Sequence, residues 1–152
     1  MTLAEHIQAV QARIAAAAEK AGRDPSEVTL VAATKVQTSE TIRAAIAAGI
    51  TVCGENRAQE FTQHWQDGAY KGAKVHFIGH LQKNKLKYLV GKVDMIESVD
   101  SEELIRLIDK RAQNLGIVQD ILIEVNIGGE ASKSGVKPEE AKSEGQAGLR
   151  KT

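Results

Sequence analysis

The sequence is poor in cysteine, in aromatic residues and in net charge. Cys53 is the only cysteine of 152 residues, which excludes an internal disulfide and a multi-cysteine metal site, and suits a reducing cytoplasm. Lysine plus arginine equals aspartate plus glutamate at 20 each, so the whole chain has no positive excess to attract nucleic acid or an anionic membrane. No apolar run reaches the roughly 18 residues of a membrane span. Residues 1–24 also lack the continuous apolar segment of a signal peptide, so we predict a cytoplasmic protein.

Apolar stretches and helical patterns alternate along the chain. Continuous apolar stretches with β-branched residues are typical of strands buried on both faces, and we expect five, at 28–34, 50–53, 74–79, 93–99 and 118–127. Helical spacing and capping signals predict helices at about 3–21, 39–49, 55–65, 81–90 and 101–116. This alternation favours a parallel sheet of β/α units, so we predict a single α/β domain over residues 1–152.

Polar residues and glycines follow the carboxyl ends of the predicted strands, where parallel α/β folds bind ligands. They are Thr34 and Lys35; Gly54, Glu55, Asn56 and Arg57; Gly79 and His80; Ser98 and Asp100; and Asn126, Gly128 and Gly129. Helix caps explain part of this set, but they do not explain Lys35. An amine between apolar walls is poorly solvated as a cation, and its neutral form can attack an aldehyde to give a Schiff base. The alternative is that Lys35 is an ordinary solvated lysine.

The chain carries five motifs in a recognisable order: "ATK" closing the first strand, "GEN" after the second, "HFIGHLQKNK" at the third, "SVDS" at the fourth and "EVNIGGEASKSG" at the fifth. In order and spacing they resemble the YggS/PROSC family of pyridoxal 5′-phosphate (PLP) homeostasis proteins, over about residues 3–141 with a divergent tail at 142–152. The resemblance implies the barrel fold of the alanine racemase barrel domain, a partial TIM-type barrel here, with PLP bound covalently by Lys35. It implies that Asn56 lines the cofactor site. His76 and His80 lie in a family motif and are further cofactor-binding candidates, although His76 is equally explained as a core histidine satisfied by the backbone.

The function that the resemblance implies is non-catalytic: binding, buffering or delivering PLP, with PLP-dependent apoenzymes as recipients. A PLP racemase needs an acid or base on each face of its substrate, and enzymes of the alanine racemase type take one of them from a second domain. Three alternatives stay open at this point. They are a PLP-dependent racemase or decarboxylase, an inert fragment that no longer retains PLP, and an RNA or phosphate contact through Lys83, Lys85, Lys87 and Lys92. The aromatic content of 3% disfavours the last, because few rings are present to stack on bases.

The length of the chain predicts an incomplete barrel. A closed (β/α)₈ barrel needs eight strands and typically about 250 residues, whereas five strands are predicted within these 152 residues. We therefore expect a barrel truncated at the C-terminus, without the family's glycine-rich phosphate loop or the arginine that faces the pyridine nitrogen. Its fifth strand would be an open sheet edge through which copies of the chain could self-associate.

Overall fold

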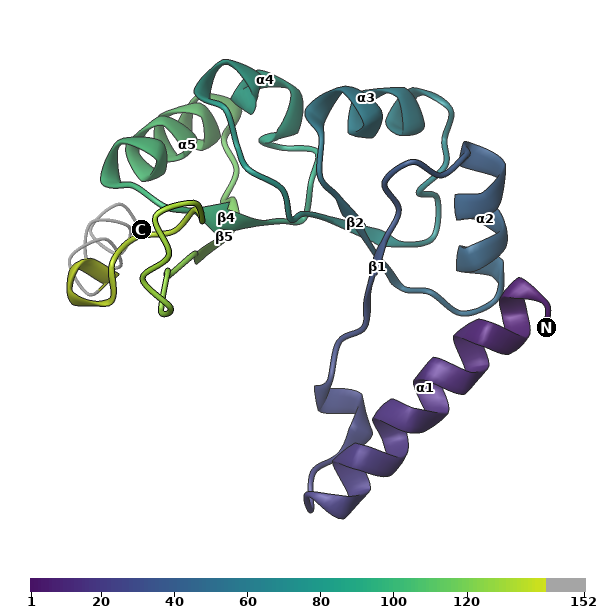
Figure 1. Cartoon of the computed structure of the whole chain (residues 1–152). Coiled ribbons are helices and arrows are strands. Elements are labelled where there is room, and N and C mark those ends of the chain that lie inside the picture. Colours follow the sequence, from purple (N-terminus) through teal and green to yellow (C-terminus); the bar gives the residue numbers. More distant parts are fainter. Residues whose placement is uncertain (142–152) are drawn as a thin grey trace.

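The computed structural model describes residues 1–141 as one parallel sheet with helices along its convex side (Figure 1). The strands lie in the order β1 (Val31–Ala33), β2 (Val52–Glu55), β3 (Lys74–Phe77), β4 (Met95–Val99) and β5 (Asp120–Ile123). The α-helices are α1 (Leu3–Lys20), α2 (Ser39–Ala47), α3 (Ala58–Gln66), α4 (Leu86–Leu89) and α5 (Glu102–Leu115), with 3₁₀ turns at Pro25–Glu27, Lys83–Lys85 and Pro138–Glu140. The predicted α/β architecture with five parallel strands is confirmed. The predicted domain range of 1–152 extends into residues 142–152, which lie outside the described part of the chain.

The core lies between the sheet and the helices α2 to α5. Cys53 pairs in register with Val75, and Phe77 pairs with Ile96, and all four side chains are buried. Side chains of a strand alternate between the two faces, and paired residues of neighbouring strands point to the same face. These residues therefore form apolar rows under the helices, and the residues between them face the opposite, concave side of the sheet.

Helix α5 shows why these local sequences fold as they do. The Ser101 hydroxyl accepts a hydrogen bond from the Leu104 N–H at the start of the helix, and two glutamates occupy the first turn, where they favourably meet the positive end of the helix dipole. Gly116 ends the helix with φ of 68°, a conformation that glycine adopts without strain. The predicted helix at 101–116 is thus confirmed, with its apolar face buried on the sheet.

Helix α1 is long but only partly covered. It projects away from the sheet in Figure 1, with Ile7 and Ala18 buried while Leu3 and Val10 of the same predicted apolar face are exposed. Within residues 1–141, no helix combines the length and apolar character needed to cross a membrane.

The two outermost strands are shorter than predicted. β1 covers only Val31–Ala33 of the stretch 28–34, because Val28 caps the preceding 3₁₀ turn. β5 covers only Asp120–Ile123 of the stretch 118–127, and Val118 and Ile127 are 86% and 83% exposed. β1 and β5 each pair with one neighbouring strand, and after β5 the pairing continues, within the described part of the chain, only as an isolated bridge between Val125 and Val136.

Two of the predicted helices were placed wrongly at their boundaries. The predicted helix at 55–65 begins later, because Glu55 is the last residue of β2 and pairs with Phe77, and α3 starts at Ala58. The predicted basic helix at 81–90 is a 3₁₀ turn followed by the four-residue α4. The chain leaves the helical conformation at Val90, where ψ is 127°, and Gly91 follows with φ of 88°.

Candidate functional site

Lys35 lies in a turn after β1 whose backbone is strained at the next residue. Val36 has φ of 62°, in the left-handed region that a β-branched residue rarely adopts. Its N–H donates to a carboxylate oxygen of Glu60 at 2.9 Å, and such strained backbone is concentrated at functional sites. Lys35 itself is exposed and makes no hydrogen bond or ion pair among residues 1–141. The amine is thus open to solvent, and the described residues do not supply the apolar walls expected around it.

His76 lies on the concave side of the sheet, and Asn56 lies at the same edge as Lys35. Ala33 pairs in register with Gly54, and Gly54 pairs with His76, so these three residues form a row across β1, β2 and β3 on one face. Lys35 and Asn56 follow the carboxyl ends of β1 and β2, at the same edge of the sheet. The register thus places His76 on the concave face, and a shared cofactor site for Lys35, Asn56 and His76 stays a prediction.

Asn56 is held by an unusually close backbone approach. A Cβ atom on Gly79 would lie 2.1 Å from the Asn56 carbonyl oxygen, so only glycine fits there. The side-chain Oδ1 of Asn56 is buried and has no hydrogen-bond partner within the described chain. Buried polar atoms are almost always paired in proteins. This unpaired atom is therefore a binding position that a ligand could complete.

His76 has a side-chain partner rather than a backbone one. Its Nδ1 lies 2.6 Å from Oε1 of Glu97, and both side chains are mostly buried. The partner expected for a core histidine is thus the Glu97 carboxylate rather than the backbone, and a cofactor-binding role of His76 stays a prediction. The contact ties β3 to β4 on the concave side and leaves only the second ring nitrogen for a ligand.

His80 is exposed and belongs to a different hollow. It lines a shallow depression of about 450 Å³ together with Asp100 and Ser101, between the ends of β3 and β4. Neither Lys35 nor Asn56 lines this depression. The structure thus does not bring His80 together with the other three candidates.

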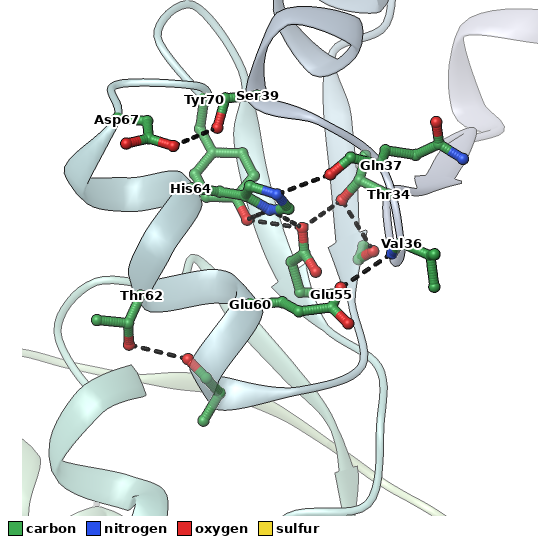
Figure 2. Close-up of polar contacts among 12 residues, drawn as sticks. Thr34, Val36, Gln37, Ser39, Glu55, Glu60, Thr62, His64, Asp67 and Tyr70 are labelled. Atoms are coloured by element: carbon green, nitrogen blue, oxygen red, sulfur yellow. Dashed lines mark hydrogen bonds and ion pairs between the residues drawn. The ribbon is translucent and has the colours of Figure 1, made fainter.

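A buried polar cluster under the Lys35 turn was missed by the sequence reasoning (Figure 2). Glu55 is fully buried, and its Oε1 accepts hydrogen bonds from the Thr34 hydroxyl at 2.6 Å and the Tyr70 hydroxyl at 2.7 Å. The same oxygen lies 2.9 Å from Nδ1 of His64, whose Nε2 lies 2.9 Å from the carbonyl oxygen of Gln37. Thr34 and Gln37 flank Lys35, so this cluster holds both ends of its turn.

One feature of the sequence could have predicted this cluster. Glu55 is two residues after Cys53, so once β2 is extended by two residues the carboxylate falls on the buried face. Glutamate is almost never fully buried unless it is paired. Its presence there predicts hydrogen-bond donors nearby, although the sequence does not say which ones. His64 and Tyr70 come from α3 and the loop after it, and only the fold brings them to Glu55.

The cluster shifts the ionisation of its neighbours. Burial, and next the negative charge of Glu55, raises the pKa of Cys53 to about 11. Burial, together with the hydrogen bond to Glu55 and the charge of that carboxylate, also raises the pKa of Tyr70. Tyr70 therefore stays a phenol and acts as a hydrogen-bond donor.

Within residues 1–141, no three His, Cys, Asp or Glu side chains are grouped as a metal ion would require.

We predict that Cys53 is almost unreactive in the folded protein. A rise of the pKa from 9.0 to about 11 makes the thiolate about 100-fold scarcer at neutral pH, and the thiolate is the reactive form. Alkylation by iodoacetamide, followed by mass spectrometry, is therefore expected to be at least about 100-fold slower in buffer than in denaturant. The denatured chain is the control, and equal rates in the two conditions would contradict the placement of the thiol.

The parallel strands and the helices between them define the class of protein, which is an α/β protein built from consecutive β/α units of a barrel. Lys35 follows the carboxyl end of the first strand. The family model "Alanine racemase, N-terminal domain" matches residues 6–150, and the chain belongs to this family. The resemblance drawn from the sequence motifs is thus confirmed. A pyridoxal phosphate homeostasis protein of Aquifex aeolicus is 46% identical over 93% of this chain and 62% of its own. The corresponding protein of Pseudomonas aeruginosa is 39% identical over 91% of this chain and 60% of its own.

Solved structures agree with the fold. A protein of unknown function from Bifidobacterium adolescentis superposes with a TM-score of 0.88 at 40% identity, over 95% of this chain and 63% of its own. PipY of Synechococcus elongatus, with PLP bound, gives a TM-score of 0.78 at 27% identity, over 95% of this chain and 63% of its own. The chain thus spans about three fifths of the length of these relatives. The partial barrel predicted from the sequence is consistent with these neighbours.

Proposed function

We propose that this chain binds PLP through a Schiff base on Lys35 and acts in PLP homeostasis, by holding or delivering the cofactor. The observation that carries the proposal is the position of Lys35, at the carboxyl edge of β1, exposed and without a partner in the described chain. The relatives named as pyridoxal phosphate homeostasis proteins, and PipY with PLP bound, support the choice of cofactor.

The residues present on the concave side fit such a ligand. The neutral amine of Lys35 adds to the aldehyde carbon of PLP, and loss of the aldehyde oxygen as water leaves a carbon–nitrogen double bond, without any oxidant or reductant. The buried, unpaired amide oxygen of Asn56 offers a polar contact close to this edge. We assign His76, which is oriented by Glu97, to the floor of the same site. Contact of His80 with the cofactor stays a prediction from the sequence.

The proposal is tested by trapping PLP on the protein. We expect PLP to give a visible absorbance band, and reduction with borohydride to fix the adduct on the peptide that contains Lys35. Lys35→Ala should abolish both signals, because it removes the one amine that the proposal assigns to the aldehyde. The matched control is Lys74→Ala, which removes an exposed lysine at the amino end of β3, away from the carboxyl edge of the sheet. It should leave the yield of the PLP adduct unchanged. Absence of the band at saturating PLP, or equal labelling of Lys35 and Lys74, would contradict the proposal.

We further propose that the role is non-catalytic. The names of the relatives refer to homeostasis rather than to a reaction. Incubation of the PLP-loaded protein with D- or L-alanine should therefore leave the chirality of the amino acid unchanged, and measurable racemisation would contradict this part. Transfer of PLP to apoenzymes, self-association through the sheet edge and a cytoplasmic location stay predictions from the sequence.

A further inference from the structure

Besides the backbone hydrogen bond from the Thr34 N–H to the Gly54 carbonyl oxygen, the turn that carries Lys35 contacts three side chains of the rest of the protein. The Thr34 hydroxyl donates to Glu55, the Val36 N–H donates to Glu60, and the Gln37 carbonyl oxygen meets the ring of His64. All three partners come from β2 and α3, and Figure 2 shows them to the left of the turn. The place of the Lys35 backbone is therefore set by side chains that are distant from it in the sequence.

The two ring nitrogens of His64 both face acceptors. Nε2 lies 2.9 Å from the carbonyl oxygen of Gln37, which can only accept, so this nitrogen carries a hydrogen. Nδ1 lies 2.9 Å from Oε1 of Glu55, and the neutral ring has only one N–H to give. A second proton must therefore lie between His64 and Glu55, on the imidazole or on the carboxyl group. Without it, a lone pair of the ring would face a carboxylate in a buried setting.

No other hydrogen-bond donor relieves this conflict. Oε1 of Glu55 already accepts from Thr34 and from Tyr70, and Oε2 has no partner among the described residues. The Tyr70 hydroxyl is 3.3 Å from Nδ1, but its single hydrogen is directed to Glu55 at 2.7 Å. The proton between the ring and the carboxyl group is thus the simplest arrangement that satisfies every polar atom around Nδ1.

Several titratable and charged groups surround the pair. The titratable groups that face the pair are the Cys53 thiol of β2, the Tyr70 phenol, the carboxylates of Glu60 and Asp67 and, beyond them, Arg43 of α2. The guanidinium of Arg43 donates to the Asp67 backbone carbonyl oxygen.

We propose that Glu55 and His64 are positioning residues for Lys35, and that the proton they share keeps the turn from Thr34 to Gln37 in place. Removing the proton breaks the contact between His64 and Glu55 and frees the ring to rotate away from Gln37. The turn then loses a hydrogen bond at its far end, while the strained backbone at Val36 gains freedom to relax. This inference rests on the proposed function only for the role of Lys35, which is to bind PLP.

The first test uses the protein without PLP, so that it stands apart from cofactor binding. Nitrogen NMR of the His64 ring should show hydrogen on both nitrogens at neutral pH. His64→Ala, which removes both contacts of the ring, should shift the amide signals of Val36 and Gln37. A ring with one bare nitrogen at neutral pH, or turn amides that do not respond to this substitution, would overturn the proposal.

A second variant separates positioning from folding. Glu55→Gln keeps the size of the side chain but removes the charge that binds the shared proton. We expect loss of the second ring hydrogen of His64. The rate of amide hydrogen exchange at Val36 and Gln37 should rise about tenfold or more. Glu27→Gln, at an exposed glutamate paired only with Arg23, is the matched control and should change none of these signals. Unchanged exchange in a folded Glu55→Gln protein would also refute the proposal.

Trapping of PLP in the same variants then distinguishes the two proposals. If the turn is positioned as inferred, Glu55→Gln should lower the yield of the Lys35 adduct about tenfold at limiting PLP, whereas Glu27→Gln should not. If the unsubstituted protein traps no PLP while its NMR signals behave as described, the proposed function fails and the positioning of the turn stands. If PLP is trapped equally well in Glu55→Gln, the positioning role fails and the proposed function stands.

Discussion

Gly79→Ala is expected to lower the free energy of unfolding by about 3 kcal/mol, which is the upper range for overpacking a buried site. The added methyl group would lie 2.1 Å from the Asn56 carbonyl oxygen and 2.7 Å from two further Asn56 backbone atoms. A backbone cannot move aside as the end of a flexible side chain can, so the ends of β2 and β3 must separate. Urea denaturation measures the loss, and the displaced Asn56 should also lower the yield of the PLP adduct.

The matched control for this substitution is Gly128→Ala. Gly128 has no heavy atom within 4 Å of the added methyl group, and its φ is not in the left-handed region. We expect the free energy of unfolding of the Gly128→Ala variant to differ by no more than about 0.5 kcal/mol from that of the unsubstituted protein. An equal effect of the two substitutions would show that the close approach of Gly79 to Asn56 is not the cause.

Phe61→Ala is expected to have the largest effect on stability, a loss of about 3–5 kcal/mol. Phe61 is a residue of α3 whose side chain is fully buried. It stacks on the Tyr70 ring, with ring centroids 5.6 Å apart and planes inclined by 15°. Removing the ring leaves a cavity behind Tyr70, whose hydroxyl donates to Glu55. Thermal or urea unfolding measures the change, and the variant should also loosen the hydrogen bonds around Glu55.

Trp65→Ala on the same helix provides the comparison. Trp65 contacts the Phe61 ring at 5.6 Å between centroids, but 44% of its surface is exposed. The lost burial is therefore smaller, and we expect about 1 kcal/mol. A Trp65→Ala loss equal to that of Phe61→Ala would mean that the core does not lie where the structure places it.

The sheet was predictable because its signal is local. The buried strands read as continuous apolar stretches, and the parallel sheet followed from their alternation with helices, as β2 to β4 confirm. The edge strands were over-predicted, because Val118 and Ile127 look like strand residues in the sequence but have no second neighbour to pair with. Pairing partners are a property of the fold, and apolar composition alone does not reveal where they end.

The candidate site was predictable in part, for the same physical reason. Lys35 and Asn56 were found because the carboxyl ends of parallel strands meet at one edge. The Glu55 cluster was not found, because His64 and Tyr70 lie 9 and 15 positions along the chain from the carboxylate that they contact. The predicted helix at 55–65 even placed Glu55 in the wrong element. Long-range polar contacts depend on geometry that no local pattern encodes.

The strands of this sheet lie side by side in the order in which they occur in the chain. From β2 to β5, each strand therefore pairs with one that the ribosome has already released. The closure of each β/α unit also spans a short stretch of chain, which keeps its entropic cost low. The sheet can thus grow one unit at a time during translation, and the turn that carries Lys35 is anchored once β2 and α3 have emerged.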